Sequence, residues 1–126
     1  MFKPLKVFPG FSVDDLSKAK EFYGKTLGMQ VLEGPEGLRI ILGEFEAFIY
    51  QKSNHVPATF TILNLVVEDV EKSVDALTEM GVKFEHYTGE METDAKGIMR
   101  SGGPTIAWFK DPAGNFISVL SKELGK

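Results

Sequence analysis

Apolar and polar residues alternate between positions 105 and 120 in a way that predicts two β-strands joined by a tight turn. The apolar residues on both flanks are β-branched or aromatic, types that fill a pleated, half-buried surface. Between them, Asp111, Pro112 and Gly114 fit the first, second and fourth positions of a type I turn, where Asp caps the backbone, Pro presets φ and Gly tolerates a positive φ. We therefore expect a β-hairpin over this segment.

A different spacing, with apolar residues three and four positions apart, predicts a helix from Asp15 to about Leu27. Asp15 suits the N-cap because its carboxylate can accept N–H groups of the first turn, and Gly28 suits the end because glycine takes the left-handed conformation. The same order of Asp cap, apolar stripe and Gly stop returns between Asp69 and Gly81. The chain therefore contains an internal duplication.

Short apolar segments flank both helices, and we expect them to be strands. Each half of the chain then has the order βαβββ, and the modules span about residues 1–53 and 58–126, with a polar connector between them. The expected strands cover residues 7–13, 29–33, 38–42 and 47–51 in the first module, and residues 58–67, 82–87 and the two arms of the hairpin in the second.

The segment 89–104 is rich in glycine and charge and is longer than the ~12–15 residues of an ordinary loop. We interpret it as a candidate lid over a binding site. The alternative is a surface loop or a contact between two subunits.

The composition is that of one compact globular domain, because 126 residues with 43% hydrophobic and 25% charged residues can bury a real core. We expect a single domain over residues 1–126. The net charge of −4 argues against a nucleic-acid partner or an anionic membrane, since both require clustered Lys and Arg. No cysteine is present, and the sequence shows neither a secretion signal nor a spanning segment, so we expect a cytoplasmic protein.

Two segments carry a family resemblance. VDDLSKAKEFYGKTLGM from Val13 resembles the first helix, and DPAGNFISV from Asp111 resembles the closing hairpin, of the vicinal oxygen chelate superfamily of glyoxalases, bleomycin-resistance proteins and extradiol dioxygenases. The resemblance implies an α+β fold in which two tandem βαβββ modules form a curled mixed sheet around a cleft. Because a second subunit often completes that cleft, it also implies a homodimer.

The resemblance further implies where a divalent metal ion would be held. In that family the ligands are His and Glu side chains on the first and last strands of each module, and these positions fall here on Phe8, Ile62, Ser118 and, near the end of module one, Tyr50. None of these suits Zn²⁺, Ni²⁺ or Fe²⁺, which prefer imidazole and carboxylate ligands. We therefore expect no metal and no other cofactor.

The two histidines do not change this expectation. Three protein ligands are usual for a catalytic ion, and no carboxylate occupies one of the family's ligand positions. We expect His55 to be a solvated residue of the connector, and His86 to be a hydrogen-bonded residue of the cleft or the surface.

The alternation of side chains along a strand predicts which residues line the cleft if Phe8 and Ile62 face inward as the family's ligands do. That set is mostly apolar and aromatic with a few hydrogen-bonding groups, as is usual for a site that holds a small organic molecule. Ordinary core packing is the alternative for each residue, and the face that Trp108 occupies is not settled by the pattern. The candidate ligand-binding residues are Phe8, Ser12, Tyr50, Phe60, Ile62, Asn64, Trp108, Phe116 and Ser118.

Three functions remain open. The leading hypothesis is a metal-free homodimer that binds or sequesters a small, largely apolar organic molecule, similar to the bleomycin-resistance branch. The second is a glyoxalase-like lyase or isomerase, or a dioxygenase, with an atypical metal site or with acid/base residues such as Glu85 and His86. The third is an interaction module without a ligand.

Overall fold

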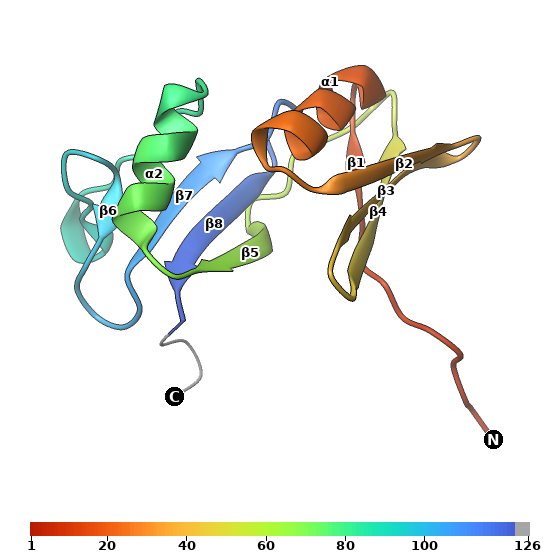
Figure 1. Ribbon diagram of the computed structural model, residues 1–126, viewed down its shortest axis with the longest axis horizontal. Helices are drawn as coiled ribbons and strands as arrows, with labels where there is room; N and C mark the ends of the chain where they lie inside the picture. The colour runs from red at the N-terminus through yellow and green to blue at the C-terminus, as the bar shows by residue number, and fades with distance from the viewer. Residues whose placement is uncertain (123–126) are drawn as a thin grey trace. The chain divides into compact units, whose positions relative to one another are not determined.

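The computed structural model describes residues 1–122. The chain divides into two compact units, Met1–Pro57 and Ala58–Lys126, called unit 1 and unit 2. Each unit has one principal helix and a four-stranded mixed sheet (Figure 1), which confirms the expected α+β fold of two βαβββ modules. In the described residues, no helix is long and apolar enough to cross a membrane.

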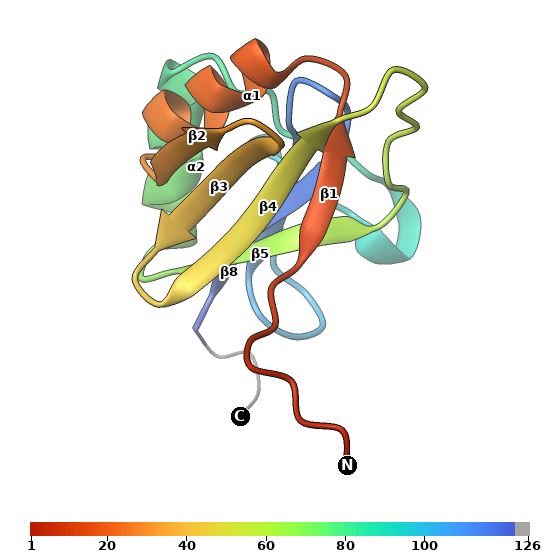
Figure 2. The ribbon, with the colours of Figure 1, turned by 90° about the vertical axis from the view of Figure 1, so that its right-hand side faces the viewer.

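Unit 1 has strand order β1-β4-β3-β2, with β1 and β4 parallel and the other pairs antiparallel (Figure 2). The Asp15 carboxylate accepts the backbone N–H of Lys18 at 3.1 Å, so the predicted N-cap is confirmed. The elements are β1 (Gly10–Val13), α1 (Leu16–Glu21), the π-helical η1 (Phe22–Thr26), β2 (Gln30–Gly34), β3 (Gly37–Leu42) and β4 (Phe45–Gln51).

The helix and the first strand of unit 1 differ from the expectation. The helix runs to Thr26 as expected, but its last turn is π-helical rather than α-helical. The first strand begins at Gly10 rather than at residue 7. Pro9 explains the late start, because it accepts the Phe48 N–H at 2.9 Å through its carbonyl but has no N–H of its own to donate.

Unit 2 has strand order β5-β8-β7-β6, and its first and last strands pair in parallel. The Asp69 carboxylate caps α2 by accepting the Lys72 N–H at 3.0 Å, which matches the cap of unit 1. The elements are β5 (Thr61–Val67), α2 (Val70–Glu79), the 3₁₀ turn η2 (Gly89–Met91), β6 (Ile98–Met99), β7 (Ile106–Lys110) and β8 (Phe116–Ser121).

The expected strand at residues 82–87 is wrong. This segment forms only an isolated bridge between Phe84 and Phe109, and the edge of the sheet is supplied by β6. Gly97 lies against the segment so closely that a Cβ at this glycine would be 2.9 Å from the Glu85 carbonyl oxygen. The segment 89–104, expected as a candidate lid, therefore contributes the fourth strand of the unit 2 sheet.

The expected hairpin is confirmed. The Asp111 side chain accepts the N–H groups of Ala113 at 2.9 Å and Asn115 at 2.8 Å, and the Gly114 N–H donates to the Asp111 carbonyl at 2.9 Å. The Asn115 side chain in turn accepts the N–H of Ala58 at 3.2 Å. The turn therefore closes the hairpin and also holds the segment that leads into β5.

Candidate functional site

The candidate site lies on the face of the unit 2 sheet that is opposite α2. On β7, Ala107 and Phe109 are fully buried, and Trp108 between them points to the other face because side chains alternate along a strand. Trp108 lies beside Ser118 on β8, and Ser118 lies beside Asn64 on β5. The Ser118 hydroxyl donates to Asn64 Oδ1 at 2.7 Å, so three of the sequence-predicted residues share one face.

A pocket of about 260 Å³ opens next to Trp108. The Trp108 and Tyr87 rings meet edge to face, with centroids 5.7 Å apart and planes at 75°, a favourable arrangement for an aromatic pair. The lining is mainly aromatic, with one methionine and two threonines: Thr59, Phe60, Thr61, Tyr87, Met91, Trp108 and Phe116.

None of the seven residues that line this pocket is an acidic or basic residue. Burial, together with the charge of Glu85, raises the pKa of the Tyr87 phenol above its ordinary value of 10.0, so Tyr87 is uncharged at physiological pH. A positive charge is close, because Lys110 Nζ lies 5.1 Å from the centroid of the Phe116 ring. The pocket can therefore hold an uncharged, largely apolar molecule without burying an unpaired charge.

The sequence-predicted residues of unit 2 fall into two groups. Phe60, Trp108 and Phe116 line the pocket, and Asn64 and Ser118 lie on the same sheet without lining it. Ile62 is located at an irregularity of β5, where the register shifts between Thr61 and Leu63. It therefore does not follow the simple alternation from which its inward orientation was expected.

In unit 1, Ser12 and Tyr50 lie side by side on β1 and β4. The Tyr50 ring stacks on Phe48 with centroids 6.1 Å apart. Phe8 precedes β1 and is 48% exposed. These unit 1 residues form a partly exposed sheet face.

The expectation of a solvated His55 is wrong. His55 is only partly exposed, and its Nδ1 lies 2.6 Å from Ser12 Oγ in a hydrogen bond. The connector is therefore held against β1 by its histidine. His86, in unit 2, is exposed.

A charged cluster lies on the same face of unit 1. Glu46 accepts hydrogen bonds from Arg39 Nε at 2.6 Å, Arg39 Nη2 at 3.0 Å and Lys6 Nζ at 3.0 Å. The hydrogen bonds from Arg39 and then Lys6 lower the pKa of Glu46 to about 2. Glu46 is therefore fully ionised and engaged by its two cations at neutral pH.

The residues at the family's metal positions do not fit a metal ion. Phe8 and Ile62 offer hydrocarbon, the Ser118 hydroxyl is fully buried and hydrogen-bonded to Asn64, and Tyr50 offers a phenol. Within residues 1–122, no three His, Cys, Asp or Glu side chains come together in a group that could hold a metal. The side chains at these four positions therefore do not supply the nitrogen and carboxylate ligands that a catalytic metal ion needs.

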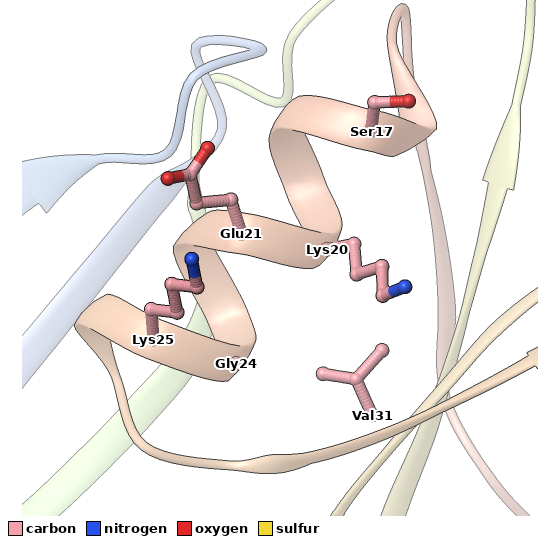
Figure 3. A pocket seen from close by; sticks show the side chains of 6 residues that line it. All are labelled: Ser17, Lys20, Glu21, Gly24, Lys25 and Val31. Carbon is pink, nitrogen blue, oxygen red and sulfur yellow. The ribbon is translucent and has the colours of Figure 1, made fainter.

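A larger hollow of about 450 Å³ lies on unit 1 beside α1 and η1 (Figure 3). It is lined mostly by charged or small side chains, and it contains none of the sequence-predicted residues. Lys20 forms an ion pair with Glu33 on β2, and a Cβ at Gly24 would lie 3.4 Å from Val31 Cγ2. This hollow is less suited to an apolar ligand than the smaller aromatic pocket of unit 2.

Tyr87, Met91, Thr59 and Thr61 line the pocket but were not predicted from the sequence. Tyr87 and Met91 belong to the segment between α2 and β6, whose path depends on tertiary contacts: the Tyr87 N–H donates to Thr93 Oγ1 at 2.9 Å. No local pattern could place them. Thr61, by contrast, is aligned with Phe116 in the sheet, so strand pairing could have indicated it.

The comparisons with known proteins agree with this architecture. The chain belongs to the Glyoxalase/Bleomycin resistance protein/Dioxygenase superfamily, because the family model matches residues 8–119. The expected resemblance to the vicinal oxygen chelate superfamily is therefore confirmed. No curated protein is significantly similar to the chain in sequence.

Three similar solved structures illustrate the range of the fold. Lactoylglutathione lyase from Agrobacterium tumefaciens has 18% identity and a TM-score of 0.68, with 97% of both chains covered. The fosfomycin resistance protein FosX from Listeria monocytogenes has 13% identity and a TM-score of 0.72, with 98% of this chain and 97% of that chain covered. TnmS3, an antibiotic binding protein from Streptomyces sp. CB03234, has 25% identity and a TM-score of 0.65, with 95% of this chain and 98% of that chain covered.

Proposed function

We propose that this protein binds or sequesters a small, largely apolar organic molecule without a metal ion, and that the pocket beside Trp108 holds it. The observation that carries the proposal is the aromatic lining of that pocket by Phe60, Tyr87, Trp108 and Phe116. Small-molecule sites are typically concave and apolar, with a few polar groups that fix orientation. Thr59 and Thr61 supply hydroxyl groups of that kind.

Two further observations support binding rather than metal-assisted catalysis. The side chains at the family's ligand positions, such as Phe8 and Ile62, are not metal ligands. The antibiotic binding protein TnmS3, which is 25% identical to this chain, has the same fold. A cytoplasmic location stays a prediction of the composition.

Intrinsic fluorescence provides a direct test, because Trp108 is the single tryptophan of the chain and lies in the pocket. A library of small aromatic and aliphatic molecules is titrated into the protein, and each molecule that changes the emission is checked by calorimetry. We expect the Phe116→Ala variant to weaken binding of such a molecule by at least about 10-fold, since an aromatic wall is lost.

Phe45→Ala is the matched control, because Phe45 is a partly exposed phenylalanine on β4 of unit 1 and does not line the pocket. It should bind with the affinity of the unmodified chain. The proposal fails if no molecule perturbs Trp108, or if both variants bind equally well. Formation of lactoylglutathione from methylglyoxal and glutathione in the presence of Ni²⁺ or Zn²⁺ would instead establish the enzymatic alternative.

A further inference from the structure

Lys110, the last residue of β7, lies on the same face of the unit 2 sheet as the pocket. Side chains alternate along a strand, so Lys110 faces the same side as Trp108, two residues earlier in β7. Lys110 is aligned with Phe116 on β8, and its Nζ lies 5.1 Å from the centroid of the Phe116 ring. Because Phe116 lines the pocket, the ammonium group lies beside the pocket wall.

Lys110 forms no ion pair with any residue in the part of the chain that the structure describes. The ion pairs of unit 2 join acidic side chains to other basic residues, namely Lys96, Arg100 and Lys122. The face of the Phe116 ring attracts the Lys110 ammonium group but does not satisfy its N–H donors. Lys110 can therefore donate hydrogen bonds to an acidic group of a bound molecule.

Glu85 places a negative charge on the opposite side of β7. Its N–H donates to the Trp108 carbonyl at 2.8 Å, on the edge of β7 that does not pair with β8. Burial, and then the charge of Glu85, raises the pKa of Tyr87, so this carboxylate acts on the Tyr87 side of the pocket. An anionic group on a ligand is therefore repelled from the Tyr87 side and attracted to the Phe116 side, where Lys110 lies.

The apolar lining determines where such a charge can be held. Burying a charge among apolar and aromatic side chains without a partner is costly, so the acidic group has to stay at the edge of the pocket. Lys110 is exposed, and an acidic group bound to it remains partly hydrated. The uncharged planar part of the same molecule can then lie between the aromatic side chains, as aromatic rings favour. These requirements describe an aromatic ring system with one acidic group at its end.

We propose that the molecule held beside Trp108 is a planar aromatic carboxylate, and that Lys110 binds its carboxylate and selects it over neutral and cationic molecules of the same shape. The role of Lys110 rests on the proposed function, because it names the class of molecule that the same pocket binds. The aromatic side chains supply the apolar contact, and Lys110 supplies the specificity for charge.

A matched set of ligands tests the preference for charge. Naphthoate, naphthamide and naphthylmethylamine share one planar ring system and carry a negative charge, no charge and a positive charge at neutral pH. Each is titrated into the unmodified chain at low ionic strength, and calorimetry gives its dissociation constant. We expect naphthoate to bind about 5-fold more tightly than naphthamide, since an exposed ion pair contributes modestly, and naphthylmethylamine to bind most weakly.

Substitution of Lys110 assigns the preference to one side chain. Lys110→Met removes the charge and keeps an unbranched apolar stem against Phe116, so we expect naphthoate to bind about 5-fold more weakly and naphthamide to bind as before. Lys72→Met is the matched control, because Lys72 is an exposed lysine of α2, on the other face of the same unit. It should leave both affinities unchanged. Glu85→Gln removes the repelling charge and should strengthen naphthoate binding or leave it unchanged.

The other outcomes separate this role from the proposed function. Equal affinities for naphthoate and naphthamide, or a neutral library molecule that binds where naphthoate does not, refute the role of Lys110 and leave the binding function intact. The role is also refuted if Lys110→Met weakens both ligands equally, which indicates lost packing on Phe116, or if Lys72→Met weakens naphthoate as much, which indicates a general effect of net charge. Failure of every molecule to bind refutes the binding function itself.

Discussion

Ser118 is a fully buried polar residue in the middle of the face that carries the candidate site. Its hydroxyl donates to Asn64 Oδ1 at 2.7 Å and lies next to Trp108 across the β7–β8 pair. A buried hydroxyl that keeps its partner contributes about 0.5–1.5 kcal/mol to stability, whereas an orphaned one is costly. The pair therefore orients Asn64 on the open face and stabilises the sheet.

We predict that Ser118→Ala lowers the free energy of unfolding by about 0.5–1.5 kcal/mol, because a hydrogen bond is lost and the exposed Asn64 amide can turn to water. Urea denaturation measures the change. Ser17→Ala, at an exposed serine of α1, is the control and should have little effect. An unchanged stability for Ser118→Ala would show that the Asn64 contact contributes nothing.

A pH prediction follows from Glu46, whose pKa is lowered from 4.5 to about 2 by Arg39 and Lys6. A lowered pKa in the folded state means that the ion pairs stabilise the protein fully above pH 4.5, and that this contribution is lost as the pH falls toward 2. Glu46→Gln lacks this contribution at every pH. The difference in Tm between the two proteins should shrink across that interval, and a constant difference would contradict the assignment.

At the residue scale, the sequence predicts the orientation of a side chain when that orientation depends on a single strand. Phe116 could be placed with Ser118 on one face by alternation alone, but the face of Trp108 required the register of β7 against β8. His55 was misjudged because its partner, Ser12, is 43 residues away in the sequence. A contact between residues so far apart in the sequence produces no pattern in the residues around either of them.

At the scale of elements, the short strand β6 explains the main error in the predicted fold. The expected strand at residues 82–87 has the right composition, but only Phe84 forms a bridge, and the Glu85 N–H donates to the Trp108 carbonyl at 2.8 Å. Asp94 helps to position β6 because its carboxylate accepts the Ile98 N–H at 2.9 Å. Burial opposes ionisation of Asp94, yet the hydrogen bonds from Ile98 and Arg100 hold its pKa below the ordinary value.

The close approach of Gly97 to the 82–87 segment gives a second stability prediction. Its φ is +86°, and an added Cβ would lie 2.9 Å from both the Glu85 oxygen and Phe84 Cβ. Gly97→Ala should lower the free energy of unfolding by about 2–4 kcal/mol through backbone strain and overpacking together.

Gly102→Ala is the matched control, because Gly102 has a φ of +74° but open space around its Cβ position. Gly102→Ala should lower the free energy of unfolding by only about 1–2 kcal/mol in the same urea experiment, because only backbone strain is added. Equal losses for the two variants would show that the packing of β6 against the 82–87 segment does not matter.

At the scale of the whole molecule, the duplicated sequence pattern predicted both modules, because each has its own cap, helix and sheet. The caps at Asp15 and Asp69 correspond in structure as they do in sequence. That the two units form one domain stays a prediction. The pocket was predictable only in part, since two of its seven lining residues, Tyr87 and Met91, come from the irregular segment between α2 and β6.

The metal prediction also belongs to the whole molecule. We expect chain purified after incubation with Zn²⁺, Ni²⁺ or Fe²⁺ to retain only substoichiometric metal by mass spectrometry, and its Tm to be unchanged by EDTA, since Phe8 and Ile62 offer no ligand atoms. A small protein without a metal site, treated in the same way, gives the background level of bound metal. One tightly held ion per chain would contradict the proposed metal-free function.

The parallel pairing of β5 with β8 has a consequence for synthesis on the ribosome. Unit 1 has all of its strands once Gln51 has emerged from the exit tunnel, since β4 then completes the pairing with β1. In unit 2, β5 has no partner strand until β8, which ends at Ser121, has also emerged. We infer that unit 1 can complete its sheet earlier in translation than unit 2 can.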